Sequence, residues 1–157
     1  MAGTRILPTT LQGEGKVRAV VARVTRASVT VDGTVVGKID ESGLLVLLGV
    51  GTDDSAVSAT TMARKLHELR ILRDEQSIAT TGAPILIVSQ FTLYGDTRKG
   101  RRPSWTRAAR PEIAEPLVQA VIDDLRLRGA RVATGRFGAM MAVESVNDGP
   151  FTVVVEV

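Results

Sequence analysis

The strongest constraint on the fold is a run of valine-rich segments, separated by turn signals, in the first third of the chain. Residues 17–25 and 28–32 are rich in β-branched side chains, and the Asp32-Gly33 pair is a strong hairpin turn signal. Residues 44–50, LLVLLGV, are apolar on both faces, which is typical of a central strand. We therefore predict a β-meander, or part of a barrel, over this region.

Two later segments carry the apolar spacing of amphipathic helices. Thr52 or Asp53 can cap a helix that runs to about Leu69. Pro111 suits the first position of a second helix, and Gly129 is a natural end for it. Clustered strands with only two main helices predict an α+β fold whose sheet is mostly antiparallel and barrel-like, rather than a doubly wound fold.

The remaining segments are assigned from their composition. Residues 70–73 are a candidate short strand, and residues 74–84, which are polar and contain Gly and Pro, are predicted to form a loop. PILIVSQFTLY, residues 84–94, reads as a buried strand whose far end becomes polar. RVAT, MAVESV and FTVVVEV predict two or three closing strands, with residues 147–150 as a β-turn between the last two.

We expect one domain over residues 17–157 and a flexible N-terminal extension over residues 1–16, which lack the apolar core of a secretory signal. The chain has no cysteine, so disulfides, thiolate metal sites and cysteine nucleophiles are excluded. No apolar stretch approaches the ~18 residues needed to cross a bilayer. We expect no membrane association and a cytoplasmic location.

Few side chains of the usual catalytic types are present. His67 is the only histidine, and it lies in the first predicted helix, where surface or packing roles are more common than catalysis. The acidic pairs Asp53-Asp54 and Asp123-Asp124 are adjacent rather than spaced to converge on a metal, so neither a metal nor a cofactor is expected. Gly49-Val50-Gly51 lacks the third glycine of a dinucleotide loop and is better interpreted as a tight turn.

Two stretches could carry function. Polar residues interrupt an apolar strand between Ser89 and Asp96, and they belong either to an internal hydrogen-bond network or to a site. Residues 97–110 contain six basic side chains and no acid, which suits phosphate oxygens of RNA, although a solvated loop is the alternative. With five aromatic side chains in all, a platform for many unpaired bases is excluded, but one terminal nucleoside can be held.

The segments SQFTLYGDTRKGRRPSW and NDGPFT resemble the two signature regions of the D-aminoacyl-tRNA deacylase family. RAVVARVTRASVTVDGTVVGKI, GLLVLLGV and TGRFGAMMAVESVNDGP also resemble that family in the same order, so the resemblance runs from about residue 17 to the end. It implies a homodimeric hydrolase for translation quality control, which needs no metal. Such an enzyme cleaves D-amino acids, or glycine from tRNA(Ala), off the tRNA 3′ end and rejects L-aminoacyl-tRNA.

The resemblance also implies residue roles. Ser89, Gln90, Phe91 and Thr92 form one pocket wall. Thr92, Ser89 and the backbone N–H of Phe91 are the candidate catalytic groups, and Gln90 is a substrate-binding residue. The backbone N–H groups of Phe91 and Thr92 are candidates for binding the oxyanion. Gly149 and Pro150 of the partner subunit, joined by a cis peptide bond, insert over the pocket as a chirality filter. The remaining expectations are that Arg23 braces the Gly-Pro element, that Phe137 and Met141 line the pocket, and that Arg98, Lys99, Arg101 and Arg102 bind tRNA.

Two mechanisms remain open: activation of water by the adenosine 2′-OH, which we favour, and nucleophilic attack by Thr92. The chain departs from the family pattern in the shortened segment 76–84, in Met140 where Asp is usual, and in Phe151 where Val is commoner. The competing function classes are a non-catalytic RNA-binding module, a dimeric scaffold with no nucleic-acid role, and an esterase of small molecules.

Overall fold

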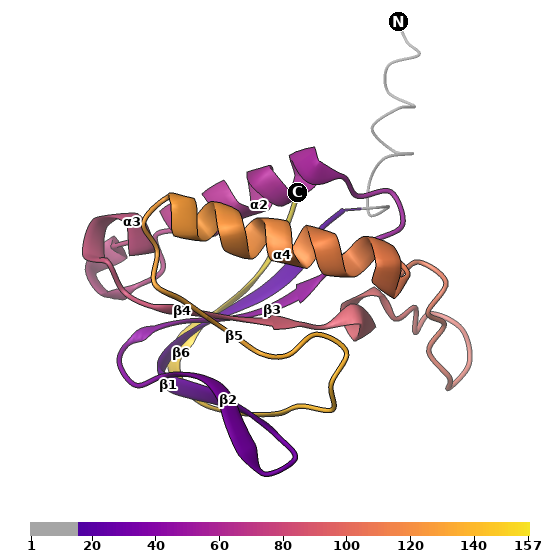
Figure 1. Cartoon of the computed structure of the whole chain (residues 1–157), viewed down its shortest axis with the longest axis horizontal. Coiled ribbons are helices and arrows are strands. Elements are labelled where there is room, and N and C mark those ends of the chain that lie inside the picture. The colour runs from indigo at the N-terminus through magenta and orange to yellow at the C-terminus, as the bar shows by residue number, and fades with distance from the viewer. Residues whose placement is uncertain (1–15) are drawn as a thin grey trace, which may run out of the picture.

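The computed structural model describes residues 16–157, so the predicted extension lies outside the described residues except for Lys16 (Figure 1). The described chain contains six strands, three α-helices and two short 3₁₀ segments. In chain order they are β1 (Arg18–Val31), β2 (Thr34–Ile39), β3 (Gly43–Gly49), α2 (Ala56–Glu68), η2 (Arg73–Glu75), α3 (Ile78–Thr81), β4 (Ile85–Ser89), η3 (Phe91–Tyr94), α4 (Pro111–Leu127), β5 (Val132–Thr134) and β6 (Ala142–Glu156).

Strand β1 organises the sheet. One of its edges pairs with β3 in its first half and with β2 in its second half, and its other edge pairs with β6, all antiparallel. Strands β3, β4 and β5 continue the sheet in parallel, which gives the order β2-β1-β3-β4-β5. The predicted α+β class with mostly antiparallel pairing is confirmed, but the sequence pattern did not indicate the parallel part.

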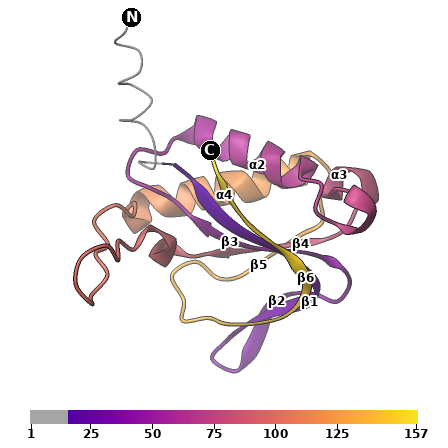
Figure 2. The same ribbon diagram turned by 180° about the vertical axis from the view of Figure 1, so that it is seen from behind.

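The sheet curls until its two ends approach each other. A β-carbon added to Gly37 of β2 would lie 1.9 Å from the carbonyl oxygen of Thr134 in β5, so only glycine permits this approach. Apolar side chains on one face, such as Val46, pack against the two long helices. A second cluster, which includes Val29 and Leu86, fills the inside of the curl. The result is a nearly closed, barrel-like sheet with α2 and α4 on one side (Figures 1 and 2).

The long helices agree with the predicted segments except at one start. Helix α4 begins at Pro111 as predicted. Helix α2 is preceded by Ser55, not capped by Thr52 or Asp53, because the backbone N–H of Ser55 is bound by the Ser58 hydroxyl. No helix within residues 16–157 is both long and apolar enough to cross a membrane.

Two predictions for residues 70–84 were wrong. Residues 70–73 do not form a strand, since the only pairing there is a single bridge between Leu72 and Gln76. The predicted loop contains the third helix, α3, as well as η2. Helix α3 forms because the Ser77 hydroxyl accepts a hydrogen bond from the Thr80 backbone N–H, while the Thr80 hydroxyl accepts one from the Ser77 N–H.

The prediction of a turn at residues 147–150 was also wrong. These residues belong to β6, which continues through a cis peptide bond between Gly149 and Pro150. Opposite them, the register between β1 and β6 shifts twice, between Ala22 and Arg26. A bulge, rather than a chain reversal, therefore accommodates the Gly-Pro pair. The predicted strand over 84–94 ends at Ser89, and residues 91–94 form η3 instead.

Candidate active site

A cavity of about 490 Å³ opens where the parallel strands β3 and β4 end. The strand side of the cavity is formed by Leu48, Val50, Val88, Ser89, Gln90 and Phe91. Facing residues come from Trp105, the start of α4, and the segment 137–143. Ionisable side chains are missing from the cavity lining that the described residues form, so its polar character comes from hydroxyl, amide and backbone groups.

Three of the four predicted SQFT residues, Ser89, Gln90 and Phe91, line this cavity, and Thr92 does not. The N–H of Gln90 donates to the carbonyl of Leu48 at 2.7 Å, which ties the end of β4 to β3. Phe91 and Thr92 then open η3, and at the first positions of a helical turn the N–H groups have no intrahelical acceptor. The side-chain amide of Gln90 donates to the Thr92 hydroxyl. The backbone donor of Phe91 therefore belongs to a residue of the cavity lining, whereas that of Thr92 belongs to the residue that follows it.

The apolar side of the cavity includes both residues predicted from the family, Phe137 and Met141. Met140, which stands where the family usually has Asp, also lines the cavity and is 92% exposed. Sequence reasoning missed Ala114 and Val118 of α4, because their spacing matches an ordinary core-facing helix. Trp105 was missed as a wall residue because the segment around it was interpreted only through its charge.

Arg23 contacts the Gly-Pro element directly. Its guanidinium donates to the carbonyls of Asp148 at 2.9 Å and Gly149 at 3.1 Å, and it forms a 3.3 Å ion pair with the Asp148 carboxylate. It also donates to the carbonyl of Ile71 at 3.3 Å and lies 4.6 Å from the ring centroid of Phe151. Only 6% of Arg23 is exposed, so these contacts are almost fully shielded from water.

Gly149 and Pro150 are exposed, and neither lines the cavity of its own chain. A second ion pair of 2.8 Å joins Arg73 to the other carboxylate oxygen of Asp148, the residue before Gly149. The side chain of Asn147 donates to the carbonyl of Arg23 at 2.8 Å. The Gly-Pro element is thus a firmly supported feature on the outer surface of β6.

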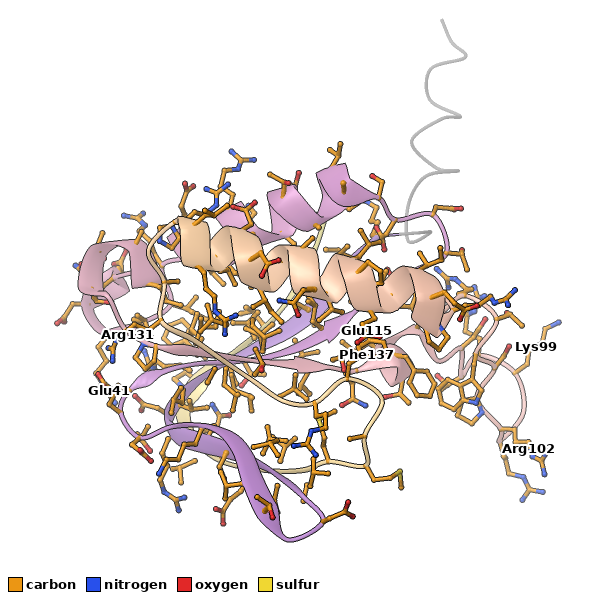
Figure 3. The ribbon with its side chains drawn as sticks, in the orientation of Figure 1. Glu41, Lys99, Arg102, Glu115, Arg131 and Phe137 are labelled. Carbon is orange, nitrogen blue, oxygen red and sulfur yellow. The ribbon has the colours of Figure 1, made fainter. Side chains whose placement is uncertain are left out.

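The basic segment forms a closed loop beside the cavity. Asp96 and Ser104 pair through two backbone hydrogen bonds of 2.8 and 2.9 Å, which join the two ends of the loop. Arg98 lies 2.6 Å from the carboxylate of Asp96 and holds the pKa of that carboxyl far below its usual range. Lys99, Arg101 and Arg102 are exposed on the loop, and Figure 3 shows Lys99 and Arg102 at its far end.

Other titratable groups lie outside the cavity lining. His67 is half-buried on α2, and the residues from 16 to 157 include no group of three His, Cys, Asp or Glu that could hold a metal ion. Burial and the charge of Asp54 raise the pKa of Tyr94, the last residue of η3. Its ring is buried and packs 4.6 Å from the guanidinium of Arg18, which anchors η3 to β1.

The family model described as D-Tyr-tRNA(Tyr) deacylase matches residues 20–156. A curated D-aminoacyl-tRNA deacylase of Thermobifida fusca is 62% identical over 140 residues, which cover 89% of this chain and 99% of that protein. The relative of that name from Acidothermus cellulolyticus is 63% identical with the same coverage.

Two solved structures are also similar. One is titled a c-Myc DNA unwinding element binding protein and has a TM-score of 0.82, with 39% identity over 89% of this chain and 98% of its own. The other, titled a probable eukaryotic D-amino acid tRNA deacylase, has a TM-score of 0.78 at 17% identity over 90% of this chain and all of its own, and shows the shared fold. The match to the family model and the identity to its relatives establish that this chain belongs to the D-Tyr-tRNA(Tyr) deacylase family.

Proposed function

We propose that this protein hydrolyses the ester bond of D-aminoacyl-tRNA, releasing the free D-amino acid and tRNA while rejecting L-aminoacyl-tRNA. The observation that carries the proposal is the cavity at the end of β4, in a chain that is 62% identical to a protein named D-aminoacyl-tRNA deacylase. A pocket of about 490 Å³ falls within the usual range for one small ligand, such as an aminoacylated nucleoside.

The proposed mechanism uses backbone groups and the substrate. Water attacks the ester carbonyl carbon, and the N–H groups of Phe91 and Thr92 stabilise the negative charge that develops on the carbonyl oxygen. The bond to the adenosine 3′ oxygen then breaks, and that oxygen takes a proton. Attack by Thr92 would require a general base for its hydroxyl proton, and no ionisable side chain lines the cavity within the described residues. This favours activation of the water by the adenosine 2′-OH.

The proposal includes a homodimer in which the Gly-Pro element acts in the partner's site. Gly149 and Pro150 are exposed and do not line their own cavity, and they lie on a strand that exposes apolar side chains. Val146 and Phe151 of β6 do not line the cavity and are 40% and 41% exposed, which is unusual for a sheet surface that faces only water. A second copy placed against β6 would cover these side chains and bring Gly149 and Pro150 over its pocket.

The Gly-Pro element would then discriminate between D- and L-residues at the α-carbon of the substrate. Backbone carbonyls that accept the amino group of a D-residue leave no space for an L side chain. Glycine has no side chain to reject, so glycine esterified to tRNA(Ala) is an expected second substrate. The basic residues Arg98, Lys99, Arg101 and Arg102 are proposed to hold the tRNA backbone. We place this activity in the cytoplasm, where charged tRNA is used.

The first test compares deacylation of D-tyrosyl-tRNA and L-tyrosyl-tRNA in the presence of a chelator. We expect release from the D-ester alone, and the same result from a His67→Ala control, because His67 lies outside the cavity. Equal release from both esters would contradict the chirality filter. Binding of tRNA without release from either ester would instead favour the non-catalytic RNA-binding module.

The mechanism and the dimer need separate tests. Thr92→Ala should retain turnover, whereas a substrate that lacks the terminal 2′-OH should be hydrolysed slowly; the opposite pair of results would assign the nucleophile to Thr92. Sedimentation should show a dimer that Val146→Asp weakens. The matched control is Val57→Asp, which changes an exposed apolar residue of α2. A monomeric wild type would refute the contribution of Gly149 and Pro150 in trans.

A further inference from the structure

We infer that Trp105, a wall residue of the cavity beside the basic loop, stacks on the nucleobase preceding the terminal adenosine of tRNA. This inference rests on the proposed function. The stacking contact would help to recognise the single-stranded RNA end, and it takes no part in the proposed chemical step.

The first observation is a pair of exposed aromatic rings at the mouth of the cavity. Phe91 and Trp105 come from different segments, and their ring centroids lie 5.5 Å apart at an interplanar angle of 68°. Phe91 is 56% exposed and Trp105 is 43% exposed, although aromatic side chains of this size usually gain stability by burial. Two large rings of the cavity lining thus remain partly open to solvent.

The second observation is that the Trp105 ring is fixed in position. A β-carbon added to Gly95 would lie 2.6 Å from Cζ3 of Trp105, so the indole packs directly on the glycine backbone. The adjacent Ser104 is held by its two backbone hydrogen bonds to Asp96. A ring that is packed on one side and half-exposed overall is a preorganised surface, which loses little conformational freedom when a flat ligand stacks on it.

The third observation is the charge beside this surface. Trp105 belongs both to the cavity wall and to the base of the loop that carries Lys99, Arg101 and Arg102. In Figure 3 the loop that bears Lys99 and Arg102 extends away from Phe137, which lines the cavity. An RNA strand that leaves the pocket toward these positive charges passes Trp105 first. The pocket holds the terminal nucleoside, so the ring meets the next base.

The ligand chemistry follows from these three facts. Proteins bind single-stranded RNA ends by stacking bases on aromatic rings and by placing basic side chains along the phosphates. Every base offers a π-face, so this contact recognises an unpaired base at this position more than its identity.

The test is a double-mutant cycle on binding of a non-hydrolysable probe. The probe is a fluorescent tRNA acceptor hairpin whose terminal adenosine carries D-tyrosine through an amide, made with and without the base of the preceding nucleotide. We expect Trp105→Ala and base removal each to weaken binding by on the order of 5- to 150-fold. The two changes together should weaken it no more than the larger one alone, because both remove the same contact.

Two further variants keep the test independent of folding. Trp105→Phe should keep most of the affinity for the probe and still bind more weakly when the preceding base is removed. Trp105→Leu, whose side chain is apolar but has no π-face, should bind both probes equally. Melting curves of each variant show whether it is folded. Losses that multiply, or a base removal without effect on the wild type, would overturn the inference. Deacylation of D-tyrosyl-tRNA by the wild type reports separately on the proposed function, so either claim can fail alone.

Discussion

Replacement of Arg23 by alanine tests whether the Gly-Pro element is held by one buried side chain. Arg23 supplies three hydrogen bonds to carbonyls and an ion pair to Asp148, and it is 6% exposed. Removing one partner of a buried pair typically costs about 3–5 kcal/mol. Because Asp148 keeps its 2.8 Å ion pair with Arg73, we expect the lower limit, about 3 kcal/mol.

The matched control is Arg26→Ala on the same strand. Arg26 also pairs with a β6 residue, Glu144, at 3.4 Å, but the two side chains are 55% and 72% exposed. Exposed pairs contribute at most about 1 kcal/mol, so the control should lose far less stability than Arg23→Ala.

The assay is urea unfolding followed by circular dichroism at a fixed protein concentration, since association would shift the midpoint. A loss of about 3 kcal/mol corresponds to a fall of about 6–12 °C in Tm for a chain of this size. Arg23→Lys should recover only part of the loss, because one ammonium group cannot reproduce the forked contacts. Equal losses for Arg23→Ala and Arg26→Ala would refute the assignment of Arg23 as the support of Gly149.

Three other predictions concern the scaffold. Tyr94→Phe should raise stability by roughly 1 kcal/mol, because the buried Tyr94 hydroxyl has no hydrogen-bond partner among the described residues. Burial raises the pKa of Asp54, so over a range of pH the folded protein retains a proton that the unfolded chain has already released. The stability of the wild type relative to Asp54→Asn should therefore fall as pH rises through that pKa. Gly37→Ala should unfold the protein or lower its Tm by more than any other single change proposed here, because the new β-carbon would collide with the Thr134 carbonyl.

Each of these scaffold predictions has a direct check in unfolding curves. Loss of stability in Tyr94→Phe would mean that the hydroxyl has a partner. A stability difference between the wild type and Asp54→Asn that does not change with pH would contradict the raised pKa. For Gly37→Ala the control is Gly33→Ala, where no atom lies within 4 Å of the added carbon and only the positive φ of +79° is unfavourable. A smaller loss at Gly37 than at Gly33 would contradict the close approach of β2 and β5.

Much of the fold could be predicted because its signals are local. The Asp32-Gly33 pair forms the hairpin between β1 and β2 with positive φ at both residues, and Pro111 starts α4. The parallel pairing of β3, β4 and β5 could not be predicted, because it depends on contacts between distant segments. A local signal was also missed at α3, since Ser77 and Thr80 have the spacing of a helix cap.

The part of the candidate site that could be predicted consists of residues whose polarity is unusual for the strand that carries them. The SQFT segment stands out because it places polar residues at the end of an apolar strand, and Ser89, Gln90 and Phe91 of this segment line the cavity. Ala114 and Val118 could not be found in this way, because an apolar pocket wall and an apolar core have the same sequence pattern. Gly149 and Pro150 looked like a turn, since nothing in their composition distinguishes a reversal from a bulge within a strand.

The absence of ionisable side chains from the described cavity lining bears on how such a site can change during evolution. Every residue except proline carries a main-chain N–H group, so only a substitution by proline deletes such a donor, whereas any substitution deletes a catalytic histidine. Substitutions in this wall would instead adjust its shape and its hydration. The side chains of the wall could therefore change between related proteins while the backbone N–H groups keep their positions. Complete loss of activity would then be reached mainly by mutations that disturb folding or assembly.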